Sequence, residues 1–286
     1  MNRILSVLPR LPIGDFFDRF IDFLTDYFGW LFSGIENGLG FAIDFFEALI
    51  GYLPSLVTIV ILGGIAFLAS RYNWKIALFT LIGFLLIDSL GLWHNAVQTI
   101  ALILVATIIA LVIGIPVGIL ASKNDRLGEQ FIRPILDFMQ TMPAFVYLIP
   151  AVIFFGLGTV PGAVATIIFS MPPVVRLTNH GIRQVPKDVV EAARSVGSTG
   201  KQLLVKIQLP IAMPTILQGI NQTIMLALSM VVIASMIGAG GLGSPVYGGV
   251  QNLNIGLGFE GGLAVVILAM ILDRVTQALG QSSSNK

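Results

Sequence analysis

Side chains that could carry out acid–base, nucleophilic or metal chemistry are few in this 286-residue chain. There are no cysteines, and His94 and His180 are the only histidines. The lack of cysteine removes thiolate nucleophiles, disulfides and cysteine metal sites, and two isolated histidines do not make a metal or catalytic set. We therefore expect no catalytic residue, no metal and no cofactor bound by this chain, which would make it a non-enzyme, and we interpret both histidines as structural.

Charged residues are absent from three long stretches of the sequence, and this affects whether an ion gradient could drive the protein. Residues 89–122, 138–175 and 207–259 contain no Asp, Glu, Lys or Arg. Charges inside a membrane usually mark proton relays or ion pathways. A secondary transporter driven by an ion gradient would lack titratable groups where it needs them, so this class of function remains the less favoured alternative.

The densest group of charged residues lies at 183–210, in the sequence RQVPKDVVEAARSVGSTGKQLLVKIQLP. Pro186 suits the start of a short helix, and Gly197 is placed to end it. Thr199 and Gln202 then form the pattern of a capping box for a second short helix, which runs to the next apolar segment. The loop is thus expected to be two short helices that meet at a glycine.

A fixed pattern of residues runs through this loop. Its members are Glu191, Ala192, Ala193, Gly197, Ile207, Leu209 and Pro210. The small alanines let a helix approach a partner surface closely, the glutamate offers an anchoring carboxylate, and the glycine permits a sharp reversal. At every defined position the pattern resembles the EAA loop of the inner-membrane permeases of ATP-binding-cassette importers. The resemblance implies that the loop docks on a cytoplasmic ATPase and that ATP is hydrolysed by that partner.

The elements that would position this loop are membrane spans. The chain is 56% hydrophobic and 11% charged, against about 25% charge in soluble domains, which excludes a water-soluble globule. Apolar runs near the ~20 residues that cross a bilayer as a helix predict an all-α polytopic membrane protein with about seven spans, and a range of six to eight. The expected spans are 52–69, 74–92, 96–121, 136–157, 160–178, 209–237 and 261–279.

Basic residues predict the orientation of these spans. They fall in alternate connections and at the C-terminus, whereas residues 238–258 contain no Lys or Arg. The positive-inside bias places the 183–210 loop and the C-terminus in the cytoplasm and the N-terminus outside. The basic residues concerned are Arg71, Lys75, Lys123, Arg126, Arg133, Arg176, Arg183, Lys187, Arg194, Lys201, Lys206, Arg274 and Lys286.

The remaining organisation follows from composition. Residues 1–50 carry seven acidic and three basic side chains among many aromatic ones, which predicts an amphipathic segment lying along the membrane surface. Residues 31–50 fit either an interfacial helix or an eighth span. We expect two accessory helices at 51–93, a core at 94–279 and a disordered tail at 280–286.

A longer resemblance concerns the cargo. Residues 136–186 are similar to the permeases for glycine betaine, choline, carnitine and proline betaine, and the distinctive parts are Gln140–Tyr147, Val160–Gly162 and Met171–Pro173. The resemblance implies a type I importer in a bacterial cytoplasmic membrane. It also implies two copies of this chain as a homodimer, two ATPase subunits, an external substrate-binding protein and contact with lipid, but no nucleic acid. Another small amino-acid-like solute is the alternative cargo.

Prolines and aromatic residues within the spans are candidates for the pathway or its gate. Prolines free backbone carbonyls and kink helices where a gate must bend, and aromatic faces attract quaternary ammonium groups. The candidates are Met142, Pro143, Phe145, Tyr147, Met171, Pro172 and Pro173.

Two other patterns are expected to be misleading. Gly238, Gly240 and Gly243 satisfy G-x-G-x-x-G but follow an apolar helix instead of a strand, so we expect a turn or close helix packing and no dinucleotide site. The bent helix pair at 183–210 superficially resembles a DNA-binding helix-turn-helix. Membrane spans on both sides of it would prevent entry into a DNA groove.

Overall fold

The structure is a computed structural model that describes residues 13–284. Every regular element in this part of the chain is a helix, so the predicted all-α class is confirmed. The longer helices are α1 (Ile13–Gly51), α2 (Ser55–Ala69), α3 (Trp74–Ser89), α4 (Trp93–Lys123), α6 (Arg133–Thr141), α7 (Leu148–Phe155), α8 (Thr159–Ser170), α9 (Pro172–Arg183), α10 (Lys187–Ser195), α12 (Leu209–Ala234), α13 (Gly243–Gln251) and α14 (Ile255–Ser284). Short helical turns join them: α5 (Asp125–Leu127), η1 (Gly128–Ile132), η2 (Ala144–Tyr147), α11 (Gly200–Leu203), η3 (Leu204–Gln208) and η4 (Ser235–Ile237).

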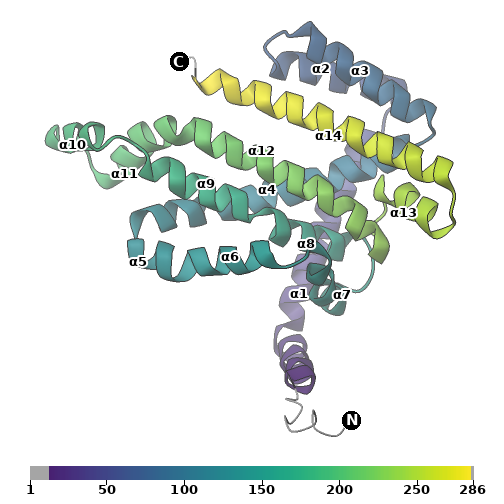
Figure 1. Ribbon diagram of the computed structural model, residues 1–286, viewed down its shortest axis with the longest axis horizontal. Helices are drawn as coiled ribbons and strands as arrows, with labels where there is room; N and C mark the ends of the chain where they lie inside the picture. The colour runs from purple at the N-terminus through teal and green to yellow at the C-terminus, as the bar shows by residue number, and fades with distance from the viewer. Residues whose placement is uncertain (1–12, 285–286) are drawn as a thin grey trace, which may run out of the picture.

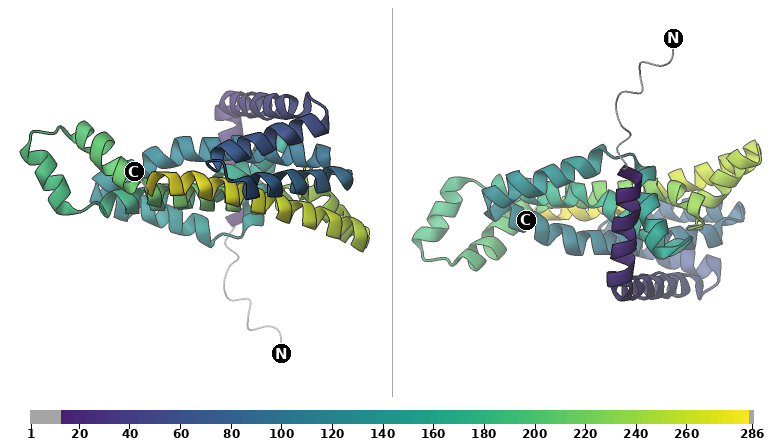
Figure 2. Two further views of the ribbon diagram at one scale, coloured as in Figure 1. Left: turned by 90° about the horizontal axis from the view of Figure 1, so that it is seen from above. Right: turned by 90° about the horizontal axis from the view of Figure 1, so that it is seen from below.

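Within residues 13–284, four helical runs are long and apolar enough to cross a bilayer: Trp93–Lys123, Thr159–Arg183, Gly200–Ile237 and Ile255–Ala278. They lie side by side along the length of the molecule, with α10 and α11 projecting at one end and α13 at the other (Figures 1 and 2). These ends are called here the loop end and the α13 end. Two further pairs of helices pass the same test only when each is taken as one bent span, which gives up to six.

The two bent pairs correct the expected boundaries. The predicted span at 136–157 is not one helix: the helix axes on either side of Met142 and Pro143 differ by 109°, and the two arms pass the test for a span only when they are taken together. The pyrrolidine ring disfavours helical backbone at the preceding residue, and Met142 is extended, with φ −71° and ψ 132°. The helix of the predicted span at 52–69 begins at Ser55 after Pro54 and pairs with α1 across a bend of 103°.

The N-terminal segment is one continuous helix over the part that the structure describes. α1 joins the acidic stretch to residues 31–50, and residues 1–12 of the expected amphipathic segment lie outside the described range. It runs across the long helices instead of alongside them (Figures 1 and 2). Gly40 of α1 lies against Val160, in the first turn of α8, and Gly51 against Val97, in the first two turns of α4. α1 therefore crosses the bundle near the α13 end.

α2 and α3 form a hairpin that packs against α14 (Figure 1). At Gly63 an added Cβ would come 2.5 Å from a methyl carbon of Leu81, so the glycine lets the two helices approach closely. Gly83 lies in the same way against Ile267 and Ile271 of α14. At the other end of the sequence, α14 continues to Ser284, past residue 280, where the sequence predicted a disordered tail.

Small residues set the packing of α9 against its two neighbours. A Cβ added to Gly118 of α4 would lie 2.6 Å from Cβ of Thr178 and 2.7 Å from the Val175 carbonyl oxygen. Gly114 lies one turn earlier on the same face, the spacing that allows close helix contact in membranes. Gly219 of α12 meets the backbone of α9, and Gly181 of α9 meets α12. These four residues, Gly114, Gly118, Gly181 and Gly219, are called here the glycine interface.

At the α13 end, polar side chains of α4 hold the turn that contains the glycine pattern at 238–243. The Asn95 side chain donates to the Gly241 carbonyl at 3.1 Å, and Gln98 Oε1 accepts from the Gly241 N–H at 2.9 Å. Thr99 Oγ1 accepts from the Leu242 N–H at 2.8 Å. Gly238, Gly240 and Gly241 have positive φ, which only glycine adopts without strain. The turn and close-packing interpretation of this pattern therefore agrees with the structure.

Two wide π-type turns lie at the loop end. One is η1, just before Arg133–Pro134, and the other is η3, just before Leu209–Pro210. In an α-helix a proline ring collides with the carbonyl four residues earlier and leaves it without a donor. Widening the turn ahead of the proline relieves that contact without ending the helix.

Candidate functional site

The 183–210 loop is shaped by its own caps. α10 begins after Pro186 and ends in a Schellman motif. In this motif the Gly197 N–H donates to the Arg194 carbonyl at 2.9 Å, and the Ser198 N–H donates to the Ala193 carbonyl at 3.1 Å. Gly197 has φ +80°, the left-handed conformation that this motif requires. The predicted stop at this glycine is thus what the structure contains.

The second half of the loop starts at the predicted capping box. Thr199 Oγ1 accepts from the Gln202 N–H at 3.3 Å, and Gln202 Oε1 accepts from the Thr199 N–H at 2.9 Å. The expected second helix is not separate from the next span, however. It passes through α11 and η3 into α12 as one helical run from Gly200 to Ile237, and Pro210 lies inside that run.

The predicted docking residues divide between the surface and the root of the loop. Glu191, Ala192 and Gly197 are exposed, whereas Ala193 is turned inward with 6% of its surface exposed. Ile207 and Leu209 are half-buried at the base, and Pro210 is exposed. The base is anchored by a buried apolar cluster of Ile182, Leu204, Ala212 and Ile216, against which Leu209 packs.

One row of exposed residues along α10 is apolar, among charged neighbours. Val189, Ala192 and Val196 follow one another at intervals of three and four residues, so they share a face of the helix. Val189 is 37% exposed and Val196 82% exposed. This row is called here the valine face, and the Glu191 carboxylate lies beside it in sequence. An exposed apolar row at the tip of a projecting helix pair is suited to contact with another protein.

Some of the predicted pathway residues gather at the bend in the 125–155 segment. Tyr147 is buried with Leu148, Ala151, Ala165 and Met230, and Met142 packs against this group. The Tyr147 hydroxyl donates to the Met139 carbonyl, which ties the helix before the bend to the one after it. The Tyr147 ring also meets Phe169 edge to face, with centroids 5.9 Å apart. Within the described residues Tyr147 thus acts as a brace across the bend.

The other pathway candidates lie apart from this group. Phe145 is half exposed and Pro143 is exposed. Pro172 and Pro173 are buried where α8 joins α9, and the Pro173 carbonyl lies close to Gly219 of α12. Met171 lies close to Gly114. The structure therefore does not bring the seven candidates together into one site.

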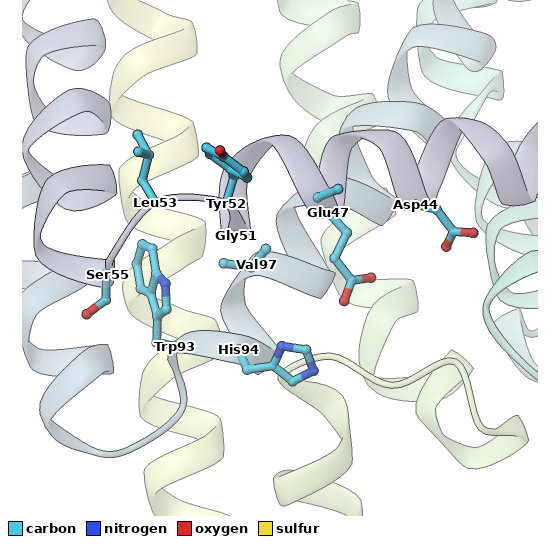
Figure 3. A pocket seen from close by; sticks show the side chains of 10 residues that line it. Asp44, Glu47, Gly51, Tyr52, Leu53, Ser55, Trp93, His94 and Val97 are labelled. Carbon is cyan, nitrogen blue, oxygen red and sulfur yellow. The ribbon is translucent and has the colours of Figure 1, made fainter.

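A cavity of about 610 Å³ lies where the end of α1 meets the start of α4 (Figure 3). Asp44, Glu47, Trp93 and His94 line it, and the Glu47 side chain points toward His94 in the figure. None of the predicted pathway residues lines this cavity. Sequence reasoning did not find it, because its two walls come from helices more than 40 residues apart.

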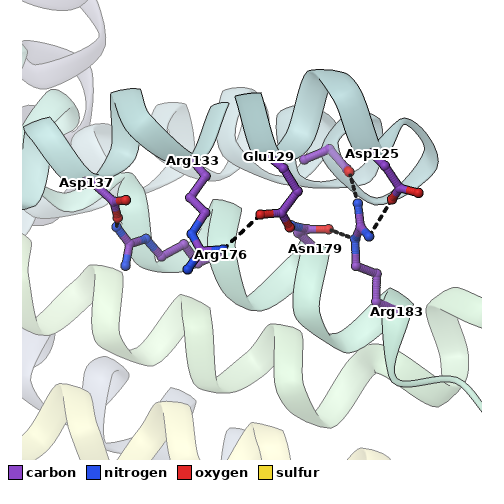
Figure 4. Close-up of polar contacts among 8 residues, drawn as sticks. Asp125, Glu129, Arg133, Asp137, Arg176, Asn179 and Arg183 are labelled. Atoms are coloured by element: carbon purple, nitrogen blue, oxygen red, sulfur yellow. Dashed lines mark hydrogen bonds and ion pairs between the residues drawn. The ribbon is translucent and has the colours of Figure 1, made fainter. Parts of the chain in front are cut away.

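Sequence reasoning also missed two ion pairs between α9 and the segment before the bend (Figure 4). Arg176 pairs with Asp137 at 2.5 Å, and Arg183 pairs with Asp125 at 2.6 Å. The sequence marked these arginines only as indicators of orientation. Their partners lie 39 and 58 positions away, a separation at which no local spacing rule connects charges.

Comparison with known proteins places these features in a family. The model for the inner membrane component of binding-protein-dependent transport systems matches residues 114–284, which include α9, the 183–210 loop, α12 and α14. The chain belongs to this family. The predicted kind of protein, an ATP-binding-cassette importer permease, is thereby confirmed, and several apolar helices agree with a multi-pass inner membrane protein.

Similar members of the family match along most of the chain. The glycine betaine transport system permease protein OpuAB of Bacillus subtilis is 54% identical over 270 residues, 94% of this chain and 95% of that protein. The glycine betaine/carnitine transport permease protein GbuB of Listeria monocytogenes is 50% identical over 281 residues, 98% of this chain and 99% of that protein. The glycine betaine/proline betaine permease protein ProW of Escherichia coli is 46% identical over 96% of this chain and 77% of its own length.

A solved structure shares the fold. A chain from inward-facing conformations of the MetNI methionine ABC transporter superposes with a TM-score of 0.59 at 22% sequence identity, covering 65% of this chain and 92% of its own. The type I importer fold expected for this permease is therefore confirmed. The roles assigned to individual residues of the loop and the pathway stay predictions.

Proposed function

We propose that this permease is the membrane-spanning subunit of an ATP-driven importer for glycine betaine or a related methylated-nitrogen osmolyte. Three relatives that match 94–98% of the chain at 46–54% identity are all named for glycine betaine. More distant relatives are named for trimethylamine N-oxide, carnitine and choline, at 30–40% identity. These named substrates share a nitrogen that carries several methyl groups, which supports the cargo class.

The observation that carries the docking half of the proposal is the valine face. Val196, which caps α10 at the tip of the loop, is 82% exposed, so this apolar surface has no partner among the residues that the structure describes. We assign this surface, with Glu191 beside it, to a groove on a separate cytoplasmic ATPase. The Schellman motif, the capping box and the apolar cluster at the base make the loop rigid. A rigid loop can transmit a movement of that ATPase to α9 and α12.

The complete importer would contain several subunits and work through a transport cycle. Two copies of the permease, two ATPase subunits and one external binding protein would form the importer, with the loop end in the cytoplasm and the α13 end outside. The distribution of Lys and Arg supports this orientation. Closure of the ATPase pair would then switch the cavity between the permease copies from inward-open to outward-open, and ATP hydrolysis would reset it.

The test is uptake by a reconstituted complex. The permease, its ATPase and its binding protein are placed in proteoliposomes with ATP inside, and entry of radiolabelled glycine betaine is measured. We expect uptake that requires all three proteins and ATP. Uptake by the permease alone under a sodium or proton gradient would instead support a secondary transporter, and competition by choline, carnitine or proline betaine would define the cargo range.

A further inference from the structure

Between α9 and the α5–α6 segment lies a cavity of about 320 Å³ with an ion pair at each end (Figure 4). Arg183–Asp125 closes the end nearer the loop, and Arg176–Asp137 closes the other. The two pairs are called here the ion-pair bridge. Both arginines come from α9 and both carboxylates from the segment that leads to the 109° bend. The later arginine pairs with the earlier aspartate, so the two segments run antiparallel.

Arg183 connects three elements at once. Nη1 pairs with Asp125 at 2.6 Å, Nη2 donates to the Ala121 carbonyl near the end of α4 at 2.9 Å, and Nε donates to Asn179 Oδ1 at 2.8 Å. A Cβ on Gly128 would lie 2.5 Å from the Ala121 carbonyl oxygen and 3.4 Å from Nη2. The glycine thus leaves the space that this guanidinium uses, and Arg183 is only four residues before the first residue of α10.

Arg176 is held differently. Its Nη2 donates to Asp137 Oδ1, but its Nε is buried and has no acceptor in the described part of the chain. A buried donor without an acceptor costs free energy. Carboxylates accept most strongly from the Nε and Nη edges of a guanidinium together. In this arrangement Asp137 takes one of the two donors on that edge, and accepting from both would satisfy the Nε group.

The two faces of α9 therefore differ in how they hold their neighbours. On one face the glycine interface locks α9 to α4 and α12 by backbone contact. On the other face a cavity separates α9 from α6, and charged groups connect them. A third ion pair beside the cavity, Arg133–Glu129 at 2.8 Å, lies within one helical segment and links nothing across the cavity.

We propose that Arg176 and Arg183 are positioning residues that make the α5–α6 segment follow α9 when the 183–210 loop is displaced. The inference rests on the proposed function. It connects the loop to the bend at Met142 and Pro143, and so to the predicted pathway residues beside it. In the second state of the transporter, Asp137 accepts from Nε and Nη2 of Arg176 together.

Charge reversal and charge exchange test this role in the complete importer. We expect Arg176→Asp to lower the number of glycine betaine molecules carried per ATP hydrolysed by about tenfold, while ATP hydrolysis continues. The exchanged pair, Arg176→Asp with Asp137→Arg, restores this ratio to within about threefold of wild type. A role in folding alone would lower the amount of inserted complex and leave the ratio unchanged, which would overturn the proposal.

The matched control is the ion pair that does not bridge. Arg133→Asp makes the same change of charge beside the same cavity, and we expect a transport ratio within about twofold of wild type. An Arg133→Asp defect as large as that of Arg176→Asp would mean that only the local charge matters. That result would also overturn the proposal.

A distance measurement tests the bridge without relying on transport. The chain has no native cysteine, so spin labels at Ile135→Cys and Gln184→Cys, in permease diluted with an excess of unlabelled permease, report the separation of the α6 and α9 segments within one copy. In the permease alone in nanodiscs we expect a narrow distribution, a broad one with Arg176→Asp, and a narrow one again in the exchanged pair. If the wild-type complex does not transport glycine betaine, the proposed function is wrong. The distance distribution still tests whether the ion-pair bridge holds the α6 and α9 segments together. An unbroadened Arg176→Asp distribution overturns it.

Discussion

The glycine interface and the 183–210 loop are two regions whose conformations are fixed in opposite ways. In the glycine interface, α4, α9 and α12 pack closely because glycine has no side chain. A Cβ added at these positions would strike a neighbouring helix. In the loop, the path of the chain depends on hydrogen bonds between residues at most five positions apart. One region is specified by tertiary contact and the other by local sequence.

This difference suggests how the two regions divide the work of a transporter. A region packed backbone to backbone resists deformation, since interiors tolerate little change in volume. A loop that caps itself keeps its shape while leaving its outward face free for a partner. Substitutions in the glycine interface should therefore cost folding stability, and substitutions on the surface of the loop should cost coupling to the partner.

The largest effect is expected in the glycine interface. Gly118→Leu puts a side chain where a Cβ alone would lie 2.7 Å from the Val175 carbonyl oxygen, and backbone cannot rotate away. We expect destabilisation of about 3 kcal/mol or more, seen as a lower melting temperature by fluorescence-detected size exclusion. The matched control is Gly64→Leu, at an exposed position where a Cβ meets nothing within 4 Å. Equal melting temperatures for the two variants would contradict the comparison.

A smaller cost is expected at the glycine of the loop. Gly197→Val forces a β-branched residue into φ +80°, at a cost of about 1–2 kcal/mol, although no neighbouring atom would be struck. Because the strain is local, the melting temperature of the bundle should change little while ATP-driven uptake falls sharply. Gly197→Asn should retain more uptake, since asparagine tolerates this conformation. Wild-type uptake in Gly197→Val would show that the shape of the loop is not needed.

The capping box should contribute about 1 kcal/mol. Thr199→Ala removes the oxygen that accepts from the Gln202 N–H, so the amides of α11 should exchange with deuterium about fivefold faster. Thr199→Ser keeps the oxygen and should exchange at the wild-type rate. Similar exchange in the alanine and serine variants would mean that the cap does not hold the start of this helix.

The smallest effect on the chain itself is expected on the valine face. Val196→Asp changes a side chain that is 82% exposed, so stability should change by less than about 0.5 kcal/mol. Binding to the ATPase should nevertheless be lost, measured as the amount of ATPase that co-purifies with the permease. Val250→Asp is the same substitution at an exposed position of α13, at the other end of the molecule, and should leave co-purification intact. Loss in both variants would argue against docking at the loop.

The same comparison explains what could be predicted from the sequence. The stop at Gly197 and the box at Thr199 and Gln202 were predictable because each cap is complete within a few residues. The bend was only partly predictable. Pro143 signals a kink, but the angle of 109° is accompanied by the Tyr147 bond to Met139 and by packing against Met230. The ion-pair bridge lay beyond prediction, because its partners meet only when the helices have packed.

The π-type turns η1 and η3 have a consequence for how this permease can evolve. Each accommodates one extra residue within a helix that otherwise continues. The extra residue rotates the side chains that follow it by about 100° about the helix axis. The direction in which the α10 tip points about the axis of α12 therefore depends on one residue in η3. Deleting that residue would rotate the tip of the loop away from the direction it now faces while leaving both helices well formed, so under the proposed docking it would separate the shape of the loop from its aim at the ATPase.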